Sequence, residues 1–315
     1  MPDAVSLIQA TAVAAITVAA VALFARWLLS SRPMWSSADC IIGVGLGCFI
    51  GCWRLGIQAK WPPEQDQDRL LLFLLPLAVV VEAAAVYLKR QPYLKWVLRA
   101  AVALAAARIL LHGSVYVANV GGPSSRQWTE WQAWQVFTAM GGALLLVWFL
   151  TTQLNKRASG WPGLAGLALA CAGAGITVML SGYATGGQIG FAALGALSAA
   201  ALVSSVLRPR EGIEGTAGVG LIVLYAVLVV GRFFGELPTW YAVVLLASPL
   251  VGWLPELPYV RRLTRWLREP LRIGVVLVPI ALVVILAQRK FVEDSARSSP
   301  SSTEPSIQDY IDFGK

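Results

Sequence analysis

Basic residues occupy every second gap between the long apolar stretches of this chain. The odd-numbered gaps, counted from the N-terminus, hold Arg26 and Arg32; Lys89, Arg90 and Lys95; Lys156 and Arg157; Arg208 and Arg210; and Arg261, Arg262, Arg265, Arg268 and Arg272. The even-numbered gaps hold only Lys60, Arg69, Arg126 and Arg232. Short cytoplasmic loops of membrane proteins accumulate Lys and Arg. The alternation therefore predicts a polytopic membrane protein whose odd-numbered loops are cytoplasmic.

The composition supports this prediction. Hydrophobic residues make up 57% of the chain and charged residues 13%, whereas soluble domains carry roughly 25% charged residues. The apolar stretches approach the ~20 residues that cross a bilayer as a helix. We expect an all-α polytopic integral membrane helix bundle of about ten transmembrane helices, at residues 5–28, 38–57, 69–88, 94–113, 133–153, 162–181, 188–207, 217–234, 238–255 and 271–289.

The orientation follows from the placement of the basic residues. With the odd-numbered loops inside, both termini lie outside, and we expect an integral protein of a bacterial cytoplasmic membrane. No basic residue precedes the first segment, so we expect that segment to be retained as a helix. The eighth and ninth segments are interrupted by Pro238 and Pro249. Two interpretations stay open for them: full crossings or a re-entrant hairpin.

The chain divides into one large and one small part. Residues 1–290 form the expected transmembrane domain, which includes a cytoplasmic amphipathic helix at 258–270. Residues 291–315 are rich in Ser and Pro and carry acidic groups. Such a segment buries too little apolar surface to order itself, so we expect a flexible polar tail.

The predicted helix at 258–270 combines an apolar stripe with a basic one. Its arginines are Arg261, Arg265, Arg268 and, just beyond it, Arg272. A basic amphipathic helix is typical of membrane-surface contact with anionic lipids. Docking of a protein partner is the alternative.

Charged groups inside the apolar segments need a partner or a purpose, because burying them in hydrocarbon is costly. Glu82 in the third segment and Arg99 in the fourth both lie ~10 Å below the same surface, at 1.5 Å per residue. A short loop joins the two segments. We therefore predict a buried Glu82–Arg99 ion pair, which acts either as structural glue or as a gate that carries a proton.

A second group of polar residues points toward the outer side. Arg108, His112 and Tyr116 follow each other at four-residue spacing, and Arg54 lies at similar depth. They form a candidate pocket for an anion or carboxylate. The alternatives are snorkelling to the outer surface or pairing with outer-loop acids. Because Arg99 and Arg108 lie on opposite faces of an Ala-rich helix, we expect the fourth segment at the centre of the bundle.

Small residues predict where helices pack closely. Gly43, Gly47 and Gly51 recur every four residues in the second segment, and glycines also thin the sixth. Such spacing lets helix backbones approach each other in lipid. The four cysteines show no metal or disulfide spacing, and we expect neither metal nor cofactor.

Function is only weakly constrained. The motifs of zinc proteases, P-loop enzymes and serine hydrolases are absent, so we expect no catalytic residues and lean against an enzyme. The net charge of +8 sits at membrane-facing loops and does not indicate nucleic-acid binding. The leading hypothesis is a permease for a small anionic or carboxylate solute. A non-catalytic subunit or scaffold that binds a partner protein is the alternative, and a membrane enzyme acting on a lipid-linked substrate is the third.

Overall fold

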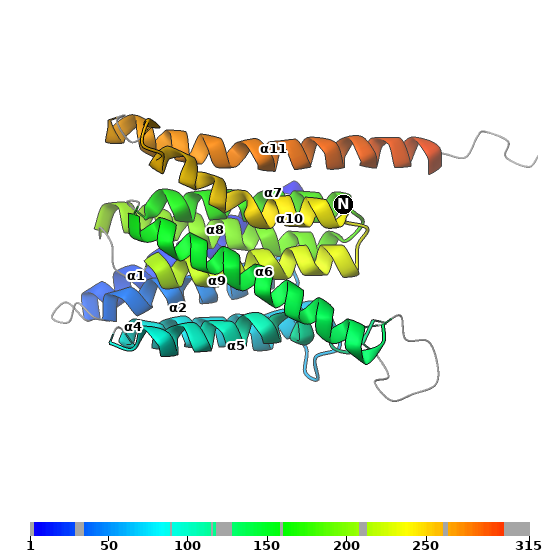
Figure 1. The fold of residues 1–315 in the computed structure, drawn as a ribbon, viewed down its shortest axis with the longest axis horizontal. Helices are drawn as coiled ribbons and strands as arrows, with labels where there is room; N and C mark the ends of the chain where they lie inside the picture. The colour runs from blue at the N-terminus through cyan, green and yellow to red at the C-terminus, as the bar shows by residue number, and fades with distance from the viewer. Residues whose placement is uncertain are drawn as a thin grey trace, which may run out of the picture.

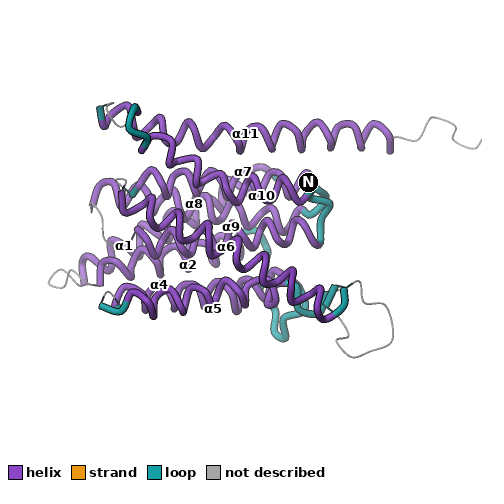
Figure 2. The backbone as a smooth tube through the Cα atoms, in the orientation of Figure 1, coloured by secondary structure: helices purple, strands orange, loops and turns teal. Residues whose placement is uncertain are grey.

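Helices with roughly parallel axes make up the computed structural model of this protein (Figure 1). The structure describes residues 3–28, 35–88, 90–114, 116–117, 128–157, 160–207, 213–260 and 264–298. Every regular element in these ranges is helical (Figure 2). The expectation of an all-α bundle is confirmed.

The helices follow the apolar segments of the sequence closely. In chain order they are α1 (Ala4–Leu28), α2 (Trp35–Arg54), α3 (Asp66–Arg69), a π-helical turn η1 (Leu70–Leu74), α4 (Leu75–Tyr87), α5 (Pro92–Leu110), α6 (Glu130–Arg157), α7 (Trp161–Leu180), α8 (Ala184–Leu207), α9 (Ile213–Phe233), α10 (Thr239–Ala247), a 3₁₀ helix η2 (Ser248–Glu256) and α11 (Arg265–Ser298).

Seven described helices are long and apolar enough to cross a membrane: Ala4–Trp27, Asp66–Tyr87, Glu130–Arg157, Trp161–Leu180, Ala184–Val206, Ile213–Phe233 and Trp266–Arg297. The protein is thus an integral membrane protein. The expected count of about ten crossings is not established by this criterion. Among the remaining helices, α5 carries three charged residues, at Lys95, Arg99 and Arg108, and α10 is only 9 residues long.

Successive helices alternate in direction along the bundle. The C-terminal ends of α4, α6 and α8 and the N-terminal ends of α5, α7, α9 and α11 lie at one end, on the left of Figure 1. We call this the basic end, because Lys95, Lys156 and Arg157 lie there. The segment α10–η2 runs from the opposite end back to the basic end (Figure 1), as a full crossing does and a re-entrant hairpin does not.

Helix α9 is the centre of the bundle. Its apolar window is 94% buried, and it packs against α2, α4, α5, α6, α7, α8 and α10. The expectation that the fourth segment is central was wrong, since α5 lies at the edge of the bundle (Figure 1). Arg99 faces inward and is fully buried, whereas Arg108 is exposed. Helix α5 therefore needs only one buried face.

Glycines bring α7 and α8 into backbone contact. A Cβ atom added at Gly190 would lie 2.4 Å from the carbonyl oxygen of Cys171, and one at Gly187 would lie 2.4 Å from that of Gly175. A Cβ at Gly47 in α2 would lie 2.8 Å from the carbonyl oxygen of Ala14 in α1. Any larger residue would push these helices apart, so the small residues do allow the expected close approach.

In the described part of 258–270, which omits 261–263, the expected surface helix is not a separate element. The chain forms η2 up to Glu256, and α11 then begins at Arg265 and continues unbroken to Ser298. Helix α11 therefore joins the basic stretch to the last apolar segment and passes the expected domain boundary at residue 290. Residues 299–315 of the expected tail lie outside the described residues.

Candidate functional site

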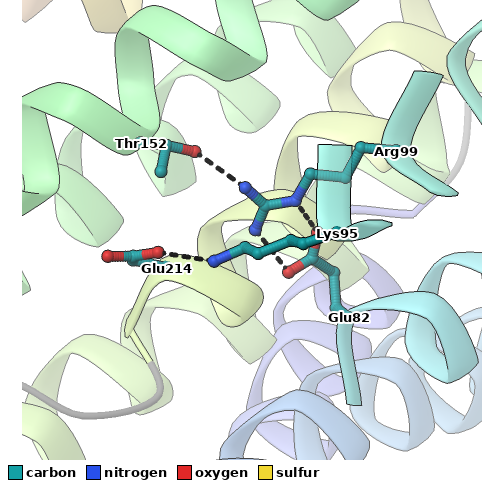
Figure 3. Close-up of polar contacts among 5 residues, drawn as sticks. All are labelled: Glu82, Lys95, Arg99, Thr152 and Glu214. Carbon is teal, nitrogen blue, oxygen red and sulfur yellow. Dashed lines mark hydrogen bonds and ion pairs between the residues drawn. The ribbon is translucent and has the colours of Figure 1, made fainter. Parts of the chain in front are cut away.

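Glu82 and Arg99 form a two-pronged ion pair between α4 and α5 (Figure 3). The Nε of Arg99 donates to Oε1 of Glu82 at 2.6 Å, and its Nη2 donates to Oε2 at 2.7 Å. The side chains are 0% and 1% exposed. This is the strong fork geometry of arginine with a carboxylate. It joins the two residues that were predicted to pair because they lie at the same depth in the membrane.

The guanidinium of Arg99 is also held by α6. Its Nη1 donates to Oγ1 of Thr152 at 3.3 Å (Figure 3). Its central carbon lies 5.0 Å from the ring centroid of Trp96 and 5.4 Å from that of Trp148. Desolvated cation–π contacts of this kind stabilise a cation by about 2 kcal/mol or more. All three guanidinium nitrogens thus donate a hydrogen bond, and two aromatic rings lie close to the cation.

Two glycines of α9 let the central helix approach the carboxylate. A Cβ at Gly218 would lie 2.8 Å from Oε1 of Glu82 and 2.9 Å from Nε1 of Trp148. A Cβ at Gly215 would lie 3.1 Å from Oε2 of Glu82. These glycines were not predicted from the sequence, although their three-residue spacing in α9 was a usable signal.

A second ion pair lies next to the first and nearer the basic end. The Nζ of Lys95 lies 2.8 Å from Oε2 of Glu214, with side chains 19% and 30% exposed (Figure 3). Lys95 precedes Arg99 by one helical turn. We call Glu82, Lys95, Arg99 and Glu214 the charge cluster. Its charges sum to zero, and its members pass from partly accessible to fully buried.

A face of α6 beside the charge cluster carries polar atoms without partners. Among the described residues, no hydrogen-bond partner is found for Nε1 of Trp148, Oγ1 of Thr151 or either amide atom of Asn155. All three side chains are buried. We call them the polar stripe, since their spacing places them on one helix face. A buried polar group left unpaired costs about 1–3 kcal/mol, so each such atom is a place where a polar solute would bind favourably.

The residues of the expected outer pocket have separate partners. Arg54 is exposed and donates to Gln9 of α1, whereas Arg108 lies 5.6 Å from the ring centroid of Trp134 in α6. Tyr116 packs its ring against Trp128 and Phe233, and His112 is exposed. The described contacts do not gather Arg54, Arg108, His112 and Tyr116 into one site.

Two of the three outer-loop acids that were the alternative partners of these arginines (Asp66, Asp68 and Glu130) are engaged elsewhere. The hydroxyl of Tyr183 donates to Oδ1 of Asp66 at 2.7 Å, and burial is the main cause that raises the pKa of this tyrosine. Asp68 accepts from the backbone N–H groups of Lys60 and Gln65. The Tyr183–Asp66 contact joins α3 to the α7–α8 turn, and the Asp68 contacts hold the loop that precedes α3.

The basic stripe expected at the membrane surface is broken up. Arg272 is 2% exposed, pairs with Glu256 and donates to the carbonyl oxygen of Gly252 at 3.1 Å. Its assignment to a surface contact was wrong, because η2 folds back against the first turns of α11 and buries it. Arg268 is half-buried. Arg261 and the side chain of Arg265 lie outside the described residues.

Among the described residues, the charge cluster brings two acids and two bases together beside buried polar atoms. The fork of Arg99 has the geometry that binds a carboxylate, and Glu82 and Glu214 each pair with a cation. Within the described ranges, no three His, Cys, Asp or Glu side chains gather as metal ligands. Models of known protein families, curated proteins and solved structures were compared with this chain, and none matches it.

Proposed function

We propose that this protein is a permease for a small solute that bears a carboxylate, and that Arg99 binds this carboxylate during transport. The observation that carries the proposal is the fully buried Glu82–Arg99 pair beside the polar stripe of α6. Ionisable residues at membrane depth that face the protein interior mark solute and ion pathways in many membrane proteins.

Stability alone gives no reason to keep such a cluster. Burying each ion costs several kcal/mol, and replacing a buried ion pair by apolar residues is often neutral or stabilising. The polar stripe adds unpaired atoms next to the pair, which costs further stability. A solute path explains both features, because the polar atoms then bind the solute during its passage.

The arrangement supports a simple exchange of partners. Lys95 and Glu214 are partly exposed, so a solute that enters from the basic end meets them first. Its carboxylate would replace that of Glu82 in the Arg99 fork, and Glu82 would turn to the ammonium group of Lys95. Lys95 and Arg99 are four residues apart on one face of α5, which makes this exchange short.

Uptake into proteoliposomes tests the proposal. We expect the purified protein to transport radiolabelled lactate or succinate above protein-free liposomes. Arg99→Lys keeps the charge but loses the fork, so uptake should fall at least tenfold, whereas the exposed Arg289→Lys on α11 should leave it unchanged. Equal uptake by the Arg99→Lys and Arg289→Lys variants would contradict the proposal, as would the absence of uptake of both solutes by the unaltered protein.

A further inference from the structure

A cavity lies in the half of the bundle opposite the charge cluster. It has a volume of about 330 Å³ and is lined by α6, α9 and α10. Its walls are mostly apolar and include Met140, Ala143, Leu228 and Val243. The volume falls within the range of roughly 300–1,000 Å³ of small-molecule sites. We call this cavity the α6–α9–α10 cleft.

One polar atom lies in the apolar wall of this cleft. Tyr225 lines it and is 3% exposed, and its hydroxyl has no hydrogen-bond partner among the described residues. A buried hydroxyl is normally paired. The phenol therefore offers a fixed hydrogen bond to whatever molecule occupies the cleft.

A positive charge lies at the mouth of the same cleft. Arg232 follows Tyr225 by seven residues, so both lie on one face of α9 and are ~10 Å apart along its axis. The Nε of Arg232 donates to Oγ1 of Thr239 at 2.8 Å. Thr239 is the first residue of α10, so the positive end of the α10 dipole faces the same mouth.

We propose that the α6–α9–α10 cleft binds an anionic lipid of the bilayer. Its phosphate lies at Arg232 and the start of α10, and its chain packs along the apolar wall. An ester oxygen of the lipid accepts a hydrogen bond from the hydroxyl of Tyr225. Lipid is the occupant because the wall of the cleft reaches an exposed apolar part of α10: Val243 in the wall is 59% exposed, and Trp240, one turn earlier on α10, is 50% exposed. Glu236, the nearby acid, lines a different cavity and not this one.

Native mass spectrometry measures this binding directly. The purified protein is incubated with equal amounts of phosphatidylglycerol and phosphatidylcholine that carry identical chains. We expect at least fivefold preference for phosphatidylglycerol. Arg232→Gln should bring the two lipids to equal occupancy, and Tyr225→Phe should lower retention of both several-fold. Arg54→Gln, which removes an exposed arginine on α2, is the matched control and should behave as the unaltered protein.

Two further variants and a soluble competitor distinguish lipid binding from misfolding and from binding of a soluble phosphate. Ala143→Phe fills the cleft from α6, and it should abolish retention of both lipids while the melting temperature stays within a few degrees. Arg99→Lys should bind lipid normally, since the charge cluster lies near the other end of α9. Equal retention of the two lipids by the unaltered protein, a preference that survives Arg232→Gln, or displacement by equimolar glycerol phosphate would each overturn the proposal.

Discussion

At the scale of single residues, the decisive contact is the fork between Arg99 and Glu82. It places two full charges where almost no water reaches them and adds a hydroxyl and two aromatic rings around the cation. Removing one partner leaves the other charge buried and uncompensated. Removing both leaves a small void but no stranded charge.

Single substitutions should therefore cost more than the double one. We expect Glu82→Ala and Arg99→Ala each to lower the free energy of unfolding by about 3–5 kcal/mol, and the double variant to cost less than their sum. Reversible unfolding in mixed micelles gives these values. The partly exposed Lys95–Glu214 pair is the control, and its contribution should be under about 1 kcal/mol. Strict additivity at Glu82 and Arg99 would contradict the coupling.

Asn155 should separate stability from transport. Both of its amide atoms lack partners among the described residues, so Asn155→Leu removes unpaired polar groups and keeps the number and branching of the side-chain heavy atoms. We expect unchanged or higher thermal stability and at least a fivefold loss of carboxylate uptake in proteoliposomes. Lower stability with normal uptake would show that Asn155 is structural and does not line a solute path.

At the scale of elements, the close packing of α9 against its neighbours depends on glycines, which carry no side chain. Gly218→Ala would place a methyl group within 2.8 Å of Oε1 of Glu82 and 2.9 Å of Nε1 of Trp148. Overpacking of this kind costs about 1–3 kcal/mol. We expect that loss in unfolding free energy together with reduced uptake.

A matched glycine on α6 gives the control for this substitution. Nothing lies within 4 Å of a Cβ added at Gly142, so Gly142→Ala should be neutral or stabilise by up to about 1 kcal/mol through helix propensity. Equal effects at Gly142 and Gly218 would mean that close approach to the carboxylate does not matter.

The Glu82–Arg99 contact could be predicted because depth along two consecutive helices is simple arithmetic. The central helix could not be predicted. Apolar side chains face both lipid and protein in a membrane, so hydrophobic periodicity does not mark the buried face of a helix. The sequence therefore predicted α5 at the centre instead of α9. Lys95 indicated only the orientation, and Glu214 was not predicted as its partner. Arg272 was misjudged for a related reason, because its partner Glu256 belongs to a 3₁₀ segment that the spacing of residues does not reveal.

At the scale of the whole molecule, the loops fall into two sets at opposite ends of the bundle (Figure 1). The basic end should face the cytoplasm, because Lys and Arg accumulate there. We expect Trp61→Cys, which replaces a side chain that is 77% exposed, to react with an impermeant maleimide on intact cells.

Arg90→Cys, an exposed position beside the α4–α5 turn, should react only after the membrane is permeabilised. Cys48, Cys52 and Cys171 are buried, and a Cys40→Ser background controls for the remaining thiol. The reverse labelling pattern would invert the orientation, and labelling of both positions on intact cells would contradict the separation of the loops into two sides.

Helix α9 supplies Gly215 and Gly218 to the charge cluster and Tyr225 and Arg232 to the cleft. Gly218, Tyr225 and Arg232 recur every seventh residue, so one edge of a single rigid rod borders two compartments about 20 Å apart. By thermodynamic linkage, the factor by which a ligand in one compartment changes the binding affinity of the other equals the factor in the reverse direction. A lipid in the cleft that shifted α9 would therefore change carboxylate affinity by the same factor as a bound carboxylate changed lipid affinity.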